Sequence, residues 1–212
     1  MIDDKHWVEM FSKELGKEYF HILAGTVQLE RQKGSIVLPP EGDAFRCFKL
    51  TPFDDLKVVI IADEARCEEG QSDGLAFSVP NGVPIPEDLQ NIFNELHSSL
   101  GVDKPKSGDL SSWASSGILL LNETLTVERG LSGSHAALGW KKFTDNCIKY
   151  ISDNKERVVF CFWCTSHSKA ALVDRNKHLV LKGSNPASKT ANAGFSGSGH
   201  FIYINEATKL WE

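Results

Sequence analysis

Apolar residues along this chain follow two patterns, one typical of helices and the other typical of buried strands. Over residues 19–31 they recur at the three- and four-residue spacing of an amphipathic helix, and residues 7–15 and 140–153 are also predicted as helices. Residues 57–61 and 158–163 are instead short, nearly continuous apolar runs. Such runs are typical of strands that are buried on both faces of a sheet.

Helices and strands alternate along the rest of the chain. Further strands are predicted over residues 118–121 and 178–182, and further helices over 89–100, 110–115 and 166–174. This alternation predicts a parallel sheet that is covered by helices on both faces. We therefore expect an α/β fold in a single domain, residues 1–212, with a four-stranded, mostly parallel central sheet flanked by helices.

The order of the elements also predicts where a ligand would bind. In sheets of this kind, ligands lie in the crevice beyond the carboxyl ends of the strands. Polar loops follow four of the predicted strands, at residues 62–73, 122–126, 164–168 and 183–199. We expect these loops to meet at one end of the sheet and to form the functional site there.

Composition narrows the classes of function. The chain has 212 residues, which is long enough to bury one full hydrophobic core. Of these, 41% are apolar and 24% are charged, as in an ordinary globular protein. Its apolar runs are too short to span a bilayer, no signal peptide is evident, and five cysteines without framework spacing indicate reduced thiols. We expect an intracellular monomer that makes no membrane contact. No set of His, Cys or carboxylate residues has metal-ligand spacing, so neither a metal nor a cofactor is expected.

The net charge of −5 counts against tight binding to duplex DNA, because DNA affinity depends on Lys and Arg. A local basic patch on one face could nevertheless coexist with an acidic whole.

One segment connects the predicted sheet to a particular chemistry. The sequence GILLLNETLTV at residues 117–127 is an apolar strand that ends in one amide, Asn122, and SHAALGW follows at residues 134–140. An Asn side chain donates and accepts hydrogen bonds at once, which matches the edge of a nucleobase. These motifs resemble family 1 uracil-DNA glycosylases, and the resemblance extends over nearly the whole chain. It implies the uracil-DNA glycosylase-like fold.

The resemblance implies a site that holds a base. In it Phe77 would stack on a base flipped out of DNA, and Asn122 would bind the edge of uracil, although an isolated Phe is more often a core residue. Arg66 stands where the family has a tyrosine whose ring excludes bases that carry a substituent at C5. The change either admits a 5-modified uracil or lets the guanidinium fold into the pocket and fill it.

Two catalytic positions differ from the family's pattern. Glu64 stands where the family has an aspartate that activates the attacking water, and Asn185 stands where a histidine hydrogen-bonds the departing uracil anion. Glutamate keeps the charge but adds a methylene group, and a shift of that size costs about a hundredfold in rate. Asp63 is an alternative carboxylate one residue earlier. The same acidic loop could equally be a solvated surface with no catalytic role.

The positions implied to contact the DNA backbone have also changed. We expect His135 near the backbone, with a cap for the following helix as the alternative. Small residues of the phosphate-gripping loops are replaced by Asp88, Thr165 and Ala187. A carboxylate at Asp88, which is also predicted as a helix N-cap, would repel phosphate. Lys189 replaces the apolar wedge that fills the gap left by a flipped base.

Two functions from different classes follow. The first is a pseudoenzyme with strongly reduced or no uracil excision, which serves as a binding module for a protein partner, for DNA bound weakly, or for a free base. The second is a divergent, monofunctional DNA glycosylase that excises uracil or a 5-modified uracil. We favour the pseudoenzyme, because catalytic and phosphate-gripping positions changed together while the fold motifs remained.

Overall fold

Four parallel strands form the central sheet of the protein. The computed structural model describes residues 2–187 and 194–212. The strands lie in the order β3 (Ile118–Thr124), β2 (Val58–Glu64), β5 (Val159–Trp163) and β6 (Leu179–Gly183), and each neighbouring pair is parallel. This arrangement confirms the predicted four-stranded α/β sheet. β2 and β5 each pair on two sides, whereas β3 and β6 form the two edges.

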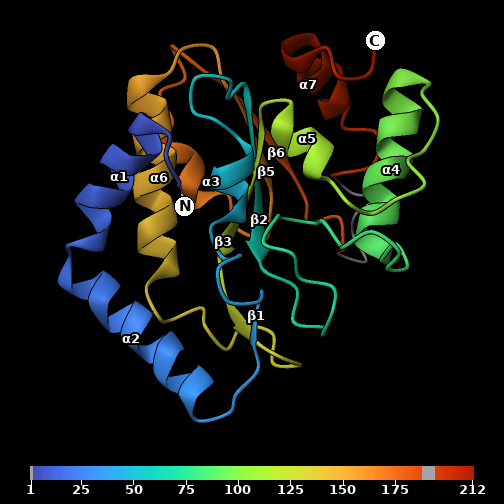
Figure 1. The fold of residues 1–212 in the computed structure, drawn as a ribbon. Helices are drawn as coiled ribbons and strands as arrows, with labels where there is room; N and C mark the ends of the chain where they lie inside the picture. The colour runs from blue at the N-terminus through green and yellow to red at the C-terminus, as the bar shows by residue number, and fades with distance from the viewer. Residues whose placement is uncertain (1, 188–193) are drawn as a thin grey trace.

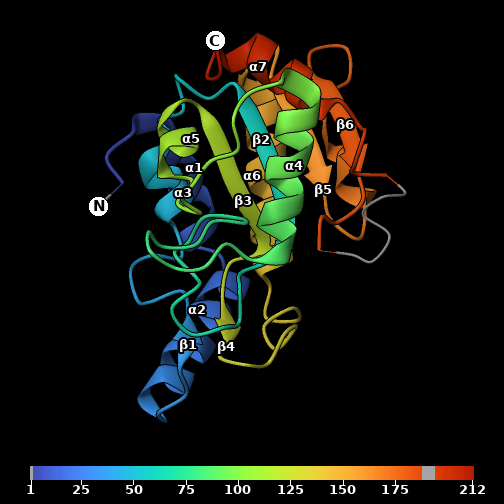
Figure 2. The same ribbon diagram turned by 90° about the vertical axis from the view of Figure 1, so that its right-hand side faces the viewer.

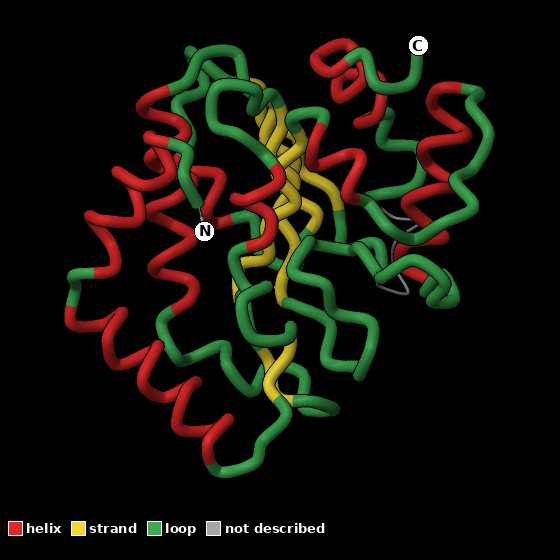
Figure 3. Tube along the Cα trace, in the orientation of Figure 1, coloured by secondary structure: helices red, strands yellow, loops and turns green. Residues whose placement is uncertain are grey.

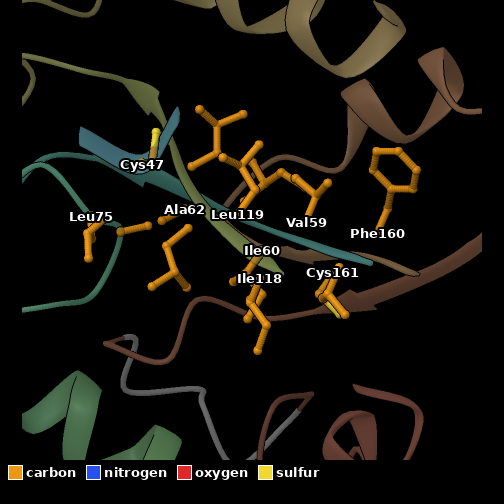
Figure 4. Close-up of a cluster of buried hydrophobic side chains, with 14 of the residues drawn as sticks. Cys47, Val59, Ile60, Ala62, Leu75, Ile118, Leu119, Phe160 and Cys161 are labelled. Atoms are coloured by element: carbon orange, nitrogen blue, oxygen red, sulfur yellow. The ribbon is translucent and has the colours of Figure 1, made fainter. Parts of the chain in front are cut away.

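The apolar runs of the sequence form the buried core of this sheet. Residues 58–61 and 118–121 have almost no exposed surface, as burial on both faces requires. In Figure 4, Val59 and Phe160 point to one face of the sheet and Ile60 and Cys161 to the other. Side chains of both parities are therefore packed, which explains why these strands show no alternation of polar and apolar residues.

Helices cover both faces, as predicted. Figure 1 shows α1, α2 and α6 on one side of the sheet and α4, α5 and α7 on the other, and Figure 2 shows α4 in front of the sheet. The helices are α1 (Lys5–Leu15), α2 (Glu18–Gln32), α3 (Arg46–Leu50), α4 (Glu87–Leu100), α5 (Ser111–Ser115), α6 (Trp140–Asn154) and α7 (His200–Thr208). Within the described part of the chain, no helix is long and apolar enough to cross a membrane.

Some local predictions were wrong. The helix expected over residues 166–174 is a short 3-10 helix, η1 (Ser168–Leu172), and the N-cap of α4 is Pro86, with Asp88 inside the first turn. A two-stranded antiparallel ribbon of β1 (Val37–Leu38) and β4 (Val127–Glu128) was not predicted. Two residues per strand are too few to produce a pattern along the sequence.

The strand register brings the functional loops together. Ala62 on β2 pairs with Asn122 on β3, and Trp163 on β5 pairs with Gly183 on β6, so all four strands end at the same side of the sheet. Figure 3 shows the strands side by side in one layer, with loops continuing from their ends. The described parts of the four polar segments lie at that end as predicted, although β2 and β3 extend further than expected, to Glu64 and Thr124.

Candidate active site

A pocket of about 550 Å³ opens at the carboxyl ends of the strands. Its walls come from the loops that follow the four strands and from the start of α4. It is lined by most of the residues that the sequence singled out, namely Asp63, Glu64, Arg66, Phe77, Asp88, Thr165, Asn185 and Ala187. The topology thus assembles residues that lie more than a hundred positions apart in the chain.

Asp63 joins the loops that follow β5 and β6. Its carboxylate accepts hydrogen bonds from the backbone N–H of Thr165 at 2.9 and 3.1 Å, from the Thr165 hydroxyl at 2.9 Å, and from the Asn185 amide at 2.7 Å. The Asn185 carbonyl oxygen in turn accepts from the N–H of Ala187 at 2.8 Å. The nitrogen and the oxygen of the Asn185 amide are therefore both hydrogen-bonded. These contacts use only one of its two amide N–H bonds.

Glu64 points to a different part of the pocket. One oxygen of its carboxylate accepts a hydrogen bond from the Ser132 hydroxyl, and the other accepts from the N–H of Gly133 at 2.8 Å. Asp63 and Glu64 are thus neighbours in sequence with separate sets of partners. The acidic loop is not simply a solvated surface, because both carboxylates are engaged in the pocket wall.

Arg66 and Asp88 form an ion pair at the pocket wall. The Nη2 atom of Arg66 donates to both carboxylate oxygens of Asp88, at 2.9 and 2.8 Å, and to the carbonyl oxygen of Phe77 at 2.8 Å. The two charged side chains are only 15% and 12% exposed. The expectation that Asp88 presents an unpaired charge to phosphate was wrong, because its partner neutralises that charge. Arg66 and Asp88, which both differ from the family's pattern, thus form one ion pair without net charge.

This ion pair should contribute to stability. Asp88→Ser leaves the guanidinium without its carboxylate in a mostly buried place, which should cost about 1–3 kcal/mol in the free energy of unfolding. Urea titration measures this loss. Asp153→Ser, which breaks an exposed ion pair with Lys149, is the matched control and should cost less than about 0.5 kcal/mol. Equal effects of the two substitutions would contradict a structural role for the pair between Arg66 and Asp88.

Phe77 lines the pocket, whereas Asn122 lies on β3 and is not among the residues that line it. Asn122 is 4% exposed, and its amide oxygen is buried with no hydrogen-bond partner among the described residues. Its neighbour on β2, Ala62, lines the pocket, as does Phe77. Phe77 has a φ of 66°, a left-handed backbone conformation that costs a bulky residue about 1–3 kcal/mol. A buried amide oxygen without a partner among the described residues and a strained backbone are both features that call for an explanation in a folded protein.

His135 does not face DNA in this structure. Its Nδ1 atom lies 2.8 Å from the Thr126 hydroxyl and its Nε2 atom lies 2.8 Å from a carboxylate oxygen of Glu30, with the side chain 1% exposed. The Thr126 oxygen also accepts from Trp140 Nε1 at 2.6 Å. Both ring nitrogens therefore face groups inside the protein, with a hydrogen bond at Nδ1 and only an ion-pair contact, without hydrogen-bond geometry, at Nε2. The expected backbone contact was wrong, and so was the helix cap, since Gly139 is the N-cap of α6.

The remaining backbone positions have different outcomes. Thr165 and Ala187 line the pocket, but the donors of Thr165 are occupied by Asp63. Lys189 lies outside the described residues. Among the described residues, no group of three His, Cys or acidic side chains could hold a metal ion.

Sequence reasoning missed three residues at the site. Ser132 and Gly133, which hold Glu64, follow β4, and Lys141 brings a positive charge to the pocket wall from the first turn of α6. Small residues in a turn carry no chemical signal of their own. Lys141 follows directly after the SHAALGW motif, so its position next to that motif was the one available clue.

Solved structures of known proteins share this fold. Mimivirus uracil-DNA glycosylase is 28% identical, with a TM-score of 0.77 over 85% of this chain and 68% of its own. A variant of the mimivirus UNG, solved in complex with UGI, is 27% identical, with a TM-score of 0.86 over 98% of this chain and 85% of its own. The fold therefore defines the class of α/β proteins built like uracil-DNA glycosylases.

Sequence relatives give the family. A uracil-DNA glycosylase from Azotobacter vinelandii is 45% identical over 94% of this chain and 87% of its own, and one from Phocaeicola vulgatus is 44% identical over 96% and 92%. The chain belongs to the uracil-DNA glycosylase family. No general family model matches it.

These relatives contradict the pseudoenzyme interpretation. Proteins that share 42–45% of their residues with nearly the full length of this chain are named uracil-DNA glycosylases. That interpretation rested on counting Glu64, Asn185, Asp88 and Ala187 as separate losses. In the structure Glu64 and Asn185 have defined partners and Asp88 is neutralised by Arg66, so the substitutions do not add up to a disabled site.

Proposed function

We propose that the protein is a monofunctional DNA glycosylase that hydrolyses the N-glycosidic bond of uracil in DNA. The observation that carries this proposal is the Asn122 amide, whose oxygen is buried beside the pocket without a partner among the described residues. An unpaired buried acceptor is costly, and a base that donates an N–H to it would remove the cost. The uracil-DNA glycosylases among its relatives support the same substrate.

The base is held by two residues in this proposal. Asn122 accepts from the N–H of uracil and donates to the adjacent carbonyl oxygen, a combination that cytosine, with its reversed donor and acceptor, does not satisfy. Phe77 lines the pocket and stacks on the face of the base. Its strained backbone fits this role, because strain of this kind persists where the surrounding structure holds a residue in a working position.

The hydrolysis uses the two carboxylates differently. Glu64 accepts a proton from water as the water oxygen bonds to the C1′ atom of the sugar. The bond between C1′ and the base nitrogen breaks, and its electron pair leaves with the base as an anion. Asn185 donates its remaining amide N–H to that anion, and Asp63 fixes the orientation of Asn185. Neither step needs a metal ion or a cofactor.

A 5-modified uracil is the second candidate substrate. Arg66 does not fold into the pocket to fill it, since its guanidinium is held by Asp88 and by the carbonyl oxygen of Phe77. The Nε atom of Arg66 is buried with no partner among the described residues, which favours a ligand that brings an acceptor. A substituent with an oxygen atom at C5 of the base would supply one.

The partner in this proposal is DNA, which implies an intracellular site of action in the cytoplasm, nucleus or nucleoid. Lys141 at the pocket wall offers a positive charge to the phosphate backbone despite the net charge of −5. Because Asp88 is neutralised by Arg66, it does not oppose this contact.

An excision assay tests the proposed function. Single- and double-stranded oligonucleotides carry one uracil, one thymine or one 5-hydroxymethyluracil, and alkaline cleavage of the abasic product reports excision. We expect turnover on uracil and none on thymine, with excision of the hydroxymethyl base as the sign of the broader specificity. An unmodified protein that releases no base from any of these substrates would refute the proposal.

A further inference from the structure

We propose that Ser132 is a positioning residue for Glu64, and that its hydroxyl and the Gly133 N–H hold the Glu64 carboxylate in its working orientation. This inference rests on the proposed glycosylase function. Each carboxylate oxygen has one donor: the Ser132 hydroxyl on Oε1 and the Gly133 N–H, at 2.8 Å, on Oε2. The two donors come from consecutive residues, 68 and 69 positions away from Glu64 in the chain.

A glutamate at this place needs such a hold. Its side chain has one more rotatable bond than an aspartate, and a side chain at the partly exposed end of a strand loses rotamer freedom only when something fixes it. One donor would leave the carboxylate free to rotate about that contact. Two donors on two oxygens define both its position and its plane, and each oxygen keeps a lone pair for water. A displacement of about 1 Å at such a group costs about a hundredfold in rate.

The turn that carries these two donors is also held by contacts that do not involve Glu64. The N–H of Leu131 donates to the carbonyl of Glu128 at 3.0 Å, and the N–H of Ser134 donates to the carbonyl of Leu131 at 3.1 Å. The Ser134 hydroxyl accepts from the N–H of Glu128 at 2.9 Å. These contacts tie the turn to β4 without using the groups that bind the catalytic carboxylate.

The segment behind the turn is anchored in the core. His135 follows the turn directly and is fixed between Thr126 and Glu30, and Trp140 bonds to the same threonine. Gly133 has a φ of 77°, the left-handed conformation that favours glycine, which turns its N–H to face Glu64. Ser132 has no such strain and is exposed, so other side chains fit at that position.

The length of the glutamate matches this turn. An aspartate at position 64 would end about 1.5 Å short, one carbon–carbon bond, and could not reach both donors from the same backbone. The added methylene is therefore part of the site and not a defect in it. Glu64→Asp should lower the excision rate in this protein, although it restores the residue type that the family resemblance would suggest.

Single-turnover excision from single-stranded uracil DNA tests the inference. Ser132→Ala should lower the maximal rate about 10- to 100-fold with KM nearly unchanged, and Ser132→Thr, which keeps the hydroxyl, should recover most of it. Ser134→Ala is the matched control: it removes a hydroxyl that stabilises the same turn but does not contact Glu64. It should change the rate less than about threefold.

A double-substitution cycle measures the coupling between Ser132 and Glu64 in the excision rate. A general loss of stability in the turn would not produce such a coupling. In the wild-type background, Glu64→Asp should lower the rate at least about tenfold. In the Ser132→Ala background the same substitution should lower it clearly less, because the contact between the two side chains is already lost. Suppose that the wild type excises uracil. The inference would then be wrong, and the proposed function would stand, if Ser132→Ala had the wild-type rate, if Ser134→Ala lost as much rate as Ser132→Ala, or if Glu64→Asp raised the rate. A wild-type protein inactive on every base would instead overturn the proposed function and this inference with it.

Discussion

Glu64→Gln is expected to lower the rate of uracil excision by about 10²- to 10⁴-fold while DNA affinity stays nearly unchanged. The amide has almost the same shape as the carboxylate, but it cannot take the proton from water. Ser132 can still donate to its oxygen, whereas Gly133 would face an amide nitrogen that accepts nothing. The substitution therefore removes the base and half of its hold, with little change in size.

Single-turnover excision and a binding titration on the same oligonucleotide measure the two quantities separately. Glu69→Gln is the control, since Glu69 is an exposed acid of the same loop that pairs with Arg129. Its rate should match that of the wild type. If Asp63→Asn abolishes excision and Glu64→Gln does not, Asp63 is the catalytic base, and the roles proposed for the two carboxylates must be exchanged.

Asn122→Ala is expected to lower kcat/KM for uracil by about 10²- to 10³-fold without a loss of stability. The amide is the group that distinguishes the base, and alanine offers neither a donor nor an acceptor. In the free protein, however, the Asn122 oxygen is buried and unpaired among the described residues, so its removal takes away an unfavourable group. Activity and stability should therefore move independently.

Urea unfolding and excision kinetics on the same preparation check this result. A variant that loses both activity and stability would show that Asn122 is a structural residue of β3. Unchanged kcat/KM would show that the base is recognised elsewhere. Either outcome would remove the observation on which the proposed function mainly rests.

The sheet could be predicted from the sequence because burial on both faces leaves a direct trace in the residues. The runs at 58–61 and 118–121 are apolar throughout, and their short length, with β-branched residues at 58–61, favours a buried strand over a buried helix. The position of the pocket then follows from topology, since parallel strands end together. Asn122, at the end of an apolar run, could therefore be chosen from the residues alone, whereas Asn185 was implied by the family resemblance.

The contacts within the site could not be predicted in the same way. Arg66 and Asp88 lie 22 positions apart, and Glu64 and Ser132 lie 68 apart, so neither pair belongs to one local motif. Judged one at a time, each substitution looked like a loss. His135 shows the opposite problem, because a polar residue in a surface-like segment is buried by partners from α2 and from the link between β3 and β4.

The two halves of the site differ in how easily they open. Asn122 lies on β3, an edge strand that is buried along its whole length, whereas Asn185 follows β6, the other edge strand, which is buried only at its last residue. Detaching an edge strand breaks a single row of hydrogen bonds, so its amide protons exchange with solvent before those of β2. We therefore expect hydrogen exchange to distinguish the two sides of the site, with the amides of β6 exchanging before those of β2.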